Sequence, residues 1–217
     1  ASDVYKRQVL EEEEISLVVS DVMMPEMNGF ELCRTIKSQL LFSHIPVILL
    51  TALTDERQRI FGITGGADDY IQKPFHTDYV KIKIIHLLQE RQKLRERLLE
   101  KLRDNKLLLS EPEKVESIDD AFLRKFAEQI EAVYADPEYN VEKLSETLGL
   151  SRGHLHRKIK ELTGTAPVEF LRTYRLNKAT QLLRQNAYTV SEVAYRTGFS
   201  SPAYFSKCFK AVYGVTP

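Results

Sequence analysis

The sequence predicts two folds in one chain: an α/β domain with a parallel sheet, followed by an all-α domain. In residues 15–74, short runs of Val, Ile and Leu alternate with helical patterns, which is typical of a parallel sheet covered by helices. In residues 140–217 a helical pattern occurs twice, which predicts two similar helical units. The charge also changes along the chain, from an acidic front part to a basic back part.

The front part is expected to contain three strands and three helices. The strands are expected over residues 15–21, 46–52 and 69–74, and the helices over 29–40, over 55–64 and from 77 onward. The first two strands are almost continuously apolar, as buried strands are. Thr54 or Asp55 is expected to cap the second helix.

The third helix is expected to continue into a connector with dense charges of both signs. Leu87, Leu88, Leu94, Leu98 and Leu102 follow one another at helical spacing. Such a segment is either a short dimerising helix or a solvated helical linker, and both interpretations stay open. Residues 110–117, which include Pro112, are expected to form a hinge, and a new helix is expected from Ile118.

The back part contains an internal repeat. At a spacing of 49 residues, Val141 matches Val190, Leu144 matches Val193, Gly149 matches Gly198, Leu150 matches Phe199 and Ser151 matches Ser200. At a spacing of 50, Leu155 matches Phe205, Ile159 matches Phe209, Lys160 matches Lys210, Gly164 matches Gly214 and Pro167 matches Pro217. The second copy therefore has one extra residue after its turn, and Pro167 is expected to start the helix between the copies.

The charges suggest different partners for the two parts. Residues 1–90 contain 9 Lys and Arg against 14 Asp and Glu, a net charge of −5. Residues 91–139 contain 10 against 12, and residues 140–217 contain 12 against 5, a net charge of +7. A basic module favours nucleic acid as a partner. Because no apolar run reaches the roughly 18 residues that cross a bilayer, and Cys33 and Cys208 have no paired spacing, we expect a cytoplasmic segment without direct membrane contact.

Three polar side chains stand at the ends of the predicted strands: Asp21, Thr51 and Lys73. The carboxyl ends of parallel strands are where open α/β sheets bind their ligands. A carboxylate there can attack a phosphoryl group, while an ammonium and a hydroxyl bind its oxygens. The alternative is an aspartate that only caps the following loop.

The motifs SDVMMPEMNG at 20–29, PVILLTA at 46–52 and GADDYIQKPF at 66–75 resemble those of response regulator receiver domains over about residues 9–90. The resemblance implies a flavodoxin-like fold, of which three parallel strands remain here. It implies Asp21 as the phosphoacceptor, Thr51 and Tyr70 as switch residues, and Lys73 as the ligand of the phosphoryl group, with a cis peptide bond between Lys73 and Pro74. It also implies a divalent metal, normally Mg²⁺, held partly by Asp21 and the backbone carbonyl of Met23.

The chain departs from this family before the first predicted strand, which only about 14 residues precede. The family has a strand, an acidic pair, a helix and a second strand there. Glu11, Glu12, Glu13 and Glu14 are predicted to end a surface helix, and the acidic pair that holds the metal is interpreted as absent. We therefore expect a truncated receiver with weak or absent Mg²⁺ binding, impaired phosphorylation of Asp21 and one unpaired edge on the first strand, which is an aggregation hazard.

Each repeated unit has the features of a helix-turn-helix, whose second helix fits the major groove of DNA. First helices are expected over 141–148 and 190–197, turns at Gly149 and Gly198, and second helices over 152–163, capped by Ser151, and over about 201–212. Leu155, Ile159 and Leu162, and in the second unit Phe205 and Phe209, are expected to be buried. The candidate DNA contacts on the other faces are Arg152, Gly153, His156, Arg157 and Lys160 in the first unit and Ser201, Ala203, Tyr204, Ser206, Lys207 and Lys210 in the second.

The motifs RLNKA at 175–179, GFS at 198–200 and YFSKCFK at 204–210 resemble those of AraC/XylS-type transcriptional regulators over about residues 118–217. The family places its two second helices in successive segments of the major groove, about 34 Å apart. Its pattern continues past Pro217, so truncation is expected at this end too.

The predicted order is a receiver over 1–90, a helical linker and hinge over 91–117, and an AraC-type domain over 118–217. This order resembles the C-terminal part of hybrid two-component regulators, in which a membrane sensor kinase and its output modules share one chain. A stand-alone response regulator is the alternative.

These features predict a sequence-specific transcription regulator, controlled by phosphorylation of Asp21 in a phosphorelay. Its expected partners are double-stranded DNA, a histidine kinase in the same or a separate chain, and a second copy in an active homodimer. The chain itself is not expected to be an enzyme, although a parent chain could include a kinase module. A phosphorylation-independent DNA-binding protein with a degenerate receiver is the alternative, while a phosphohydrolase is disfavoured because the second carboxylate that it needs is replaced by Met23.

Overall fold

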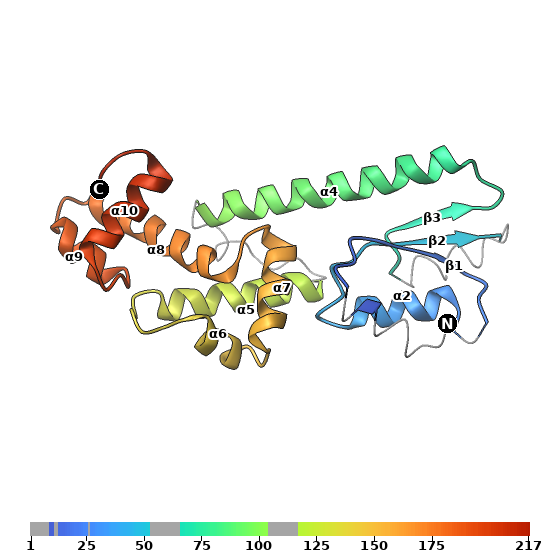
Figure 1. The fold of residues 1–217 in the computed structure, drawn as a ribbon, viewed down its shortest axis with the longest axis horizontal. Coiled ribbons are helices and arrows are strands. Elements are labelled where there is room, and N and C mark those ends of the chain that lie inside the picture. Colours follow the sequence, from blue (N-terminus) through green and yellow to red (C-terminus); the bar gives the residue numbers. More distant parts are fainter. Residues whose placement is uncertain (1–8, 11–12, 26, 53–65, 104–116) are drawn as a thin grey trace. The chain divides into compact units, whose positions relative to one another are not determined.

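The computed structural model describes residues 9–10, 13–25, 27–52, 66–103 and 117–217, with the backbone alone for 98–103. The chain divides into two compact units, Ala1–Leu94 and Arg95–Pro217. The division falls inside the long helix α4 (Thr77–Arg103). The helices and strands of both units are shown in Figure 1.

The first unit is built on a three-stranded parallel sheet, as predicted. Its strands are β1 (Val18–Asp21), β2 (Val47–Thr51) and β3 (Asp69–Gln72), in the order β1-β2-β3. Asp21 pairs with Leu50, and Thr51 pairs with Gln72, so the three strands end side by side. The register therefore brings the three predicted polar residues to one edge of the sheet.

The first strand begins at Val18, three residues later than predicted. The Val18 N–H donates to the carbonyl of Pro46 at 2.8 Å. Since Pro46 has no N–H to donate, the sheet ladder starts beyond it and residues 15–17 stay outside the strand. In the described part of the sheet β1 is an edge strand, with β2 as its neighbour. Whether its other edge is unpaired in the complete protein stays a prediction.

A helix packs against the sheet and encloses an apolar core with it. Helix α2 (Gly29–Ser38) begins at a capping box formed by Asn28 and Glu31, and it ends two residues before the predicted end. It packs on β2 and buries Cys33 and Ile36. Residues 9–10 are helical, and the exposed residues 13–14 follow them, as predicted for the end of a helix. The predicted helix over 55–64 and its cap lie outside the described residues.

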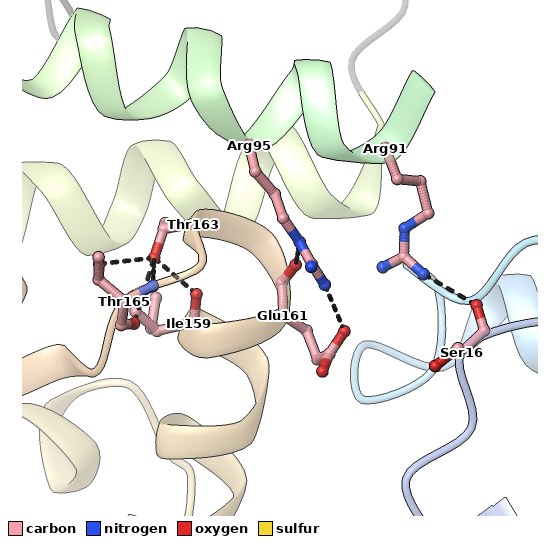
Figure 2. Close-up of polar contacts among 7 residues, drawn as sticks. All are labelled: Ser16, Arg91, Arg95, Ile159, Glu161, Thr163 and Thr165. Atoms are coloured by element: carbon pink, nitrogen blue, oxygen red, sulfur yellow. Dashed lines mark hydrogen bonds and ion pairs between the residues drawn. The ribbon is translucent and has the colours of Figure 1, made fainter. Parts of the chain in front are cut away.

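Helix α4 contacts the rest of the first unit through two basic side chains. Lys83 forms an ion pair with Asp69 of β3 at 2.9 Å. The Arg91 guanidinium donates to the carbonyl of Ser16 at 3.3 Å (Figure 2). The helix continues beyond these contacts to Arg103, so the connector is helical, as the sequence predicted.

The described part of the second unit beyond α4 is all helical, as predicted. Its helices are α5 (Ile118–Val133), α6 (Val141–Thr147), α7 (Arg152–Thr163), α8 (Pro167–Arg184), α9 (Val190–Arg196) and α10 (Pro202–Tyr213). Helices α5, α6 and α7 with the start of α8 form the first lobe. The end of α8 with α9 and α10 forms the second lobe, and α8 runs from one lobe into the other (Figure 1).

The internal repeat appears as two equivalent helix-turn-helix units. Gly149 and Gly198 adopt positive φ values of 68° and 79° in the two turns. The second helix of each unit is capped by a serine, Ser151 before α7 and Ser201 before α10. The pairing of Ser151 with Ser200 was therefore wrong, because the extra residue of the second copy lies between the turn glycine and the cap.

Each lobe has its own aromatic core. In the first lobe, Phe126 of α5 packs edge-on against Phe170 of α8, with ring centroids 4.8 Å apart. In the second lobe, the core is formed by these buried residues: Leu176, Ala179, Val193, Ala194, Phe199, Phe205, Cys208 and Phe209. Each lobe therefore has its own core, and α8 contributes side chains to both cores.

Candidate functional site

The carboxyl edge of the sheet brings together Asp21, Thr51 and Lys73. The Lys73 ammonium forms an ion pair and a hydrogen bond with Oδ2 of Asp21. The Lys73 backbone N–H donates to the carbonyl of Thr51 at 2.7 Å, so the residue after β3 is anchored to the end of β2. The predicted cis peptide bond between Lys73 and Pro74 is confirmed.

The surroundings of Asp21 favour its charged form. The hydrogen bond from Lys73 lowers the pKa of the Asp21 carboxyl, and a bond from the Met23 N–H, at 3.2 Å to Oδ1, acts in the same direction against the opposing effect of burial. The side chain is 34% exposed. Asp21 is therefore an ionised, accessible carboxylate next to a fixed cation, as a nucleophile toward a phosphoryl group requires.

Gly29 is a contributor to this edge whose role the sequence interpretation missed. A Cβ atom at Gly29 would lie 2.4 Å from the carbonyl oxygen of Asp21. The Gly29 N–H donates to the carbonyl of Val22 at 3.0 Å. A glycine at the start of the helix after the aspartate is the signal that could have indicated this close approach.

Tyr70, the predicted aromatic switch residue, lies on β3 and is half-buried. It packs against the apolar core of the first unit beside Cys33. Burial raises the pKa of the Tyr70 phenol further above the physiological range, in which the side chain is neutral. Its role as a switch, like that of Thr51, stays a prediction.

The described residues by themselves do not fit a magnesium ion. Mg²⁺ demands near-octahedral oxygen coordination, usually with one or two carboxylates. Among the described residues no group of three or more His, Cys, Asp or Glu side chains could hold a metal. At this edge Asp21 already binds Lys73, and the Met23 carbonyl would add one neutral ligand. Glu11 and Glu12 lie outside the described residues.

The second helices of the two units, α7 and α10, are here named the reading helices. Their predicted inner faces are buried at Leu155, Ile159, Leu162, Phe205 and Phe209. Most candidate DNA contacts are exposed: Arg152, Gly153, His156, Lys160, Ala203, Tyr204, Lys207 and Lys210. Arg157, Ser201 and Ser206 are partly exposed.

Arg152 and Ser201, both candidate DNA contacts, also have partners within the protein. Arg152 forms an ion pair with Glu142 of α6 at 2.6 Å. The Ser201 hydroxyl accepts the N–H of Tyr204 at 3.3 Å as the cap of α10. Arg152 must therefore exchange Glu142 for DNA if it contacts a phosphate, and Ser201 acts first as a cap.

The carboxyl end of α7 is held by polar contacts (Figure 2). The Arg95 guanidinium donates to the carbonyl of Glu161 and to its Oε2, each at 2.7 Å. The Thr163 hydroxyl donates to the carbonyl of Ile159 at 2.7 Å and lies 3.1 Å from that of Thr165. A cation at the carboxyl end of a helix also interacts favourably with the helix dipole.

A buried ion pair fixes the middle of the same reading helix. The Lys158 side chain is 0% exposed, and its ammonium lies 2.6 Å from Oδ1 of Asp119 at the start of α5. The sequence interpretation missed this residue. Its spacing from Leu155, Ile159 and Leu162 places it on the buried face of the helix, so the signal was present.

Comparisons with known proteins agree with this description. Residues 4–85 match the response regulator receiver domain, and residues 144–217 match a helix-turn-helix domain. The chain is 40% identical over 202 residues to Histidine kinase P4 of Formosa agariphila, covering 93% of this chain and 14% of that protein. It is 46% identical over 86 residues to the Transcriptional regulatory protein GltR of Pseudomonas aeruginosa, covering 40% of this chain and 36% of that protein.

A similar solved structure is the C-terminal domain of the two-component response regulator yesN from Fusobacterium nucleatum. It is 33% identical, with a TM-score of 0.43, and the match covers 44% of this chain and 92% of that chain. The chain spans less than half the length of either curated relative. In the described residues, no helix combines the length and apolarity that a membrane span requires. The chain thus joins a response regulator receiver domain to an AraC-type helix-turn-helix domain.

Proposed function

We propose that this chain is a sequence-specific transcription regulator of a two-component system, whose DNA binding is set by phosphorylation of Asp21. In this proposal residues 1–90 accept the phosphoryl group, residues 91–117 connect, and residues 118–217 bind double-stranded DNA. The phosphodonor is a histidine kinase, in the same chain or a separate one, and the segment works in the cytoplasm. The meeting of Asp21, Thr51 and Lys73 at one edge of the sheet carries the proposal.

The chemistry at Asp21 is a phosphoryl transfer from a phosphohistidine. A carboxylate oxygen of Asp21 forms a bond to phosphorus while the bond from phosphorus to the imidazole nitrogen breaks. The electron pair of that bond stays on the nitrogen, which takes up a proton from solvent. The Lys73 ammonium compensates the charge of the phosphoryl oxygens, and the Thr51 hydroxyl donates to one of them.

The DNA-binding step rests on the two reading helices and on the charge of their domain. Residues 140–217 carry a net charge of +7, which favours the polyanion through release of counterions. Lys160, Lys207 and Lys210 are exposed on the reading helices. We propose that they mainly bind phosphates, while smaller side chains near the helix starts allow base contacts.

A second function is favoured by the sparse set of carboxylates described around Asp21. In this alternative the receiver serves protein contacts only, and DNA binding does not depend on phosphorylation. The chain then binds the same DNA with the same reading helices. The two functions differ in their response to a phosphodonor.

The test uses the complete natural protein and its Asp21→Asn variant, each with and without acetyl phosphate. Fluorescence anisotropy measures binding to a duplex that the protein selects from a random pool. We expect acetyl phosphate to strengthen wild-type binding about tenfold, which corresponds to 1.4 kcal/mol, and to leave Asp21→Asn unchanged. Asp78→Asn, an exposed carboxylate on α4, is the matched control and responds like the wild type.

The outcomes separate the two functions. Salt-sensitive DNA binding that ignores acetyl phosphate in every variant supports the degenerate receiver. An equal response of Asp21→Asn and wild type excludes Asp21 as the phosphoacceptor. Absence of salt-sensitive binding to any selected duplex rules out both functions.

A further inference from the structure

Arg175 lies in the middle of α8, at the point where this helix passes from the first lobe to the second. Its guanidinium donates to three backbone carbonyls: Nε to Tyr134 at 2.8 Å, and Nη2 to Asp136 at 2.7 Å and to Tyr139 at 3.4 Å. These carbonyls belong to the end of α5 and the segment after it. Carbonyls at the end of a helix have no partner within the helix, and the planar guanidinium suits several of them at once.

The second lobe reaches the same place through the turn at Gly198. A Cβ atom at Gly198 would lie 2.1 Å from the carbonyl oxygen of Tyr134 and 2.8 Å from Nε of Arg175. The backbone of the second lobe therefore lies directly against the end of α5, which belongs to the first lobe. Gly149, the equivalent glycine of the first lobe, would have no atom within 4 Å of an added Cβ.

A neighbouring polar group holds α5 to α8 without involving the second helix-turn-helix unit. Glu131 of α5 accepts a hydrogen bond from the Tyr174 hydroxyl and one from the Lys178 ammonium, the latter at 2.7 Å. The Lys178 ammonium also lies 5.3 Å from the ring centroid of Tyr134. These contacts secure α8 to the first lobe, and the contact at Arg175 and Gly198 links the second turn to the first lobe directly.

We propose that Arg175 is a positioning residue that sets the separation and orientation of the two reading helices, so that DNA binding depends on the number of base pairs between the two major-groove segments. The inference rests on the proposed DNA-binding function. Each added base pair moves the second segment by roughly 3.4 Å and rotates it by roughly 35° about the duplex axis. Two lobes locked at one geometry cannot follow that change, whereas two lobes joined only by α8 can adjust to it.

The first experiment compares wild type with Arg175→Gln and Arg175→Lys on duplexes of different spacing. The parent duplex is selected from random sequence by the wild type, and footprinting locates its two contacted segments. One or two base pairs are then inserted between them, and affinities are measured by anisotropy. Arg172→Gln is the matched control, since Arg172 lies on the same helix and pairs with its neighbour Glu169 at 3.4 Å.

We expect one inserted base pair to weaken wild-type and Arg172→Gln binding about tenfold, within the cost of a mismatched base pair. For Arg175→Gln we expect the inserted base pair to lower the affinity by no more than about threefold relative to the parent duplex. We also expect this variant to bind the parent duplex more weakly than the wild type does. Arg175→Lys keeps the charge but not the planar fork, and it should lie between the two. If Arg175→Gln lowers the affinity for every duplex by the same factor, the residue has a merely structural role and the proposal is overturned.

A glycine pair provides a test that leaves Arg175 unchanged. Gly149→Ala and Gly198→Ala place the same residue at similar positive φ values, 68° and 79°, so both introduce comparable backbone strain. Only Gly198→Ala also places a methyl group against the first lobe. We expect the spacing preference to change in Gly198→Ala and to stay as in wild type in Gly149→Ala, and equal changes in both would contradict the inference.

A measurement without DNA separates this inference from the proposed function. Spin labels on Glu146→Cys and Ser191→Cys, both exposed, report the distance between the lobes, because Cys33 and Cys208 are buried. We expect a narrow distance distribution in the otherwise wild-type chain and a broader one with Arg175→Gln. Identical distributions would show that α8 alone sets the geometry, whatever the DNA experiments give.

Discussion

Asp21 and Lys73 form a reactive pair because the sheet brings together two residues that are 52 positions apart in the chain. The lysine favours the ionised carboxylate, and the Met23 N–H supports the same charge state. A low pKa keeps the carboxylate ionised throughout the physiological range. In the proposed function the same lysine also binds the phosphoryl oxygens, so that a single cation would stabilise both the ionised aspartate and its phosphorylated form.

The influence of Lys73 can be measured directly. We expect Lys73→Met to raise the pKa of the Asp21 carboxyl, because the main cause that lowers it is removed while burial, which raises it, remains. Lys81→Met is the control, since Lys81 is exposed and pairs with Asp78. The titration is followed by the chemical shift of the Asp21 carboxyl carbon in NMR. An unchanged or lower pKa in Lys73→Met would contradict the assigned cause.

Within the first lobe, helix α7 is held to α5 by an ion pair as well as by apolar packing. Its inner face combines Leu155 and Ile159 with the fully buried Lys158, whose ammonium is paired with Asp119 of α5. Burying an ammonium is unfavourable unless a counter-charge is close. The pair therefore fixes the position of α5 relative to α7. Because it lies on the buried face of α7, it positions this reading helix without using its exposed face.

The two partners of this pair should differ in their contribution to stability. Asp119→Ala leaves the ammonium buried without this carboxylate, and we expect a loss of about 3 kcal/mol in the free energy of unfolding. Lys158→Met keeps the volume and removes the charge, so we expect a loss of about 1 kcal/mol or less. Urea unfolding followed by circular dichroism measures both.

Asp120→Ala is the control for the effect of a carboxylate in the first turn of α5. Asp120 is exposed and bonds to Ser117, so its removal should cost less than about 1 kcal/mol. Equal losses of the free energy of unfolding in Asp119→Ala and Asp120→Ala would show that the buried ion pair stabilises the protein no more than an exposed carboxylate in the first turn does.

At the level of the whole molecule, the proposed function requires that phosphorylation change the behaviour of a domain that already contains both reading helices. We propose that it shifts a population toward a homodimer through the connecting helix. Dimerisation raises the effective concentration of the second DNA-binding domain at neighbouring sites. Helix α4 carries exposed apolar side chains, among them Ile82, Ile85 and Leu94, which such a contact would cover.

Sedimentation velocity of the complete protein tests this step. We expect acetyl phosphate to convert monomer into dimer in the wild type and to leave Asp21→Asn monomeric. Leu94→Glu should still be phosphorylated but remain monomeric, because a charge replaces a side chain that is 56% exposed and would be buried in the dimer. Gln89→Glu, also exposed on α4, is the control and should dimerise. A dimer of Leu94→Glu would place the interface elsewhere.

The sequence by itself determined the features that depend on neighbouring residues. Helix α7 has the predicted bounds, because the Ser151 cap and the left-handed Gly164 define its ends locally. Helix α8 begins at the predicted Pro167 for the same kind of reason. The three parallel strands also follow from local runs of apolar residues, although β1 is shorter than predicted, since its length depends on Pro46, which precedes the partner strand β2.

Only the tertiary structure decided which distant groups meet. Lys73 contacts Asp21, which lies 52 residues earlier in the chain. Lys158 contacts Asp119 at a separation of 39 residues, and Arg175 contacts the Tyr134 carbonyl at a separation of 41. Motif spacing indicated the first of these contacts but neither of the others. The reason is physical: a lysine or arginine in a helical pattern can equally face solvent, and the packing of separate helices decides whether a carboxylate or a free carbonyl lies within its reach.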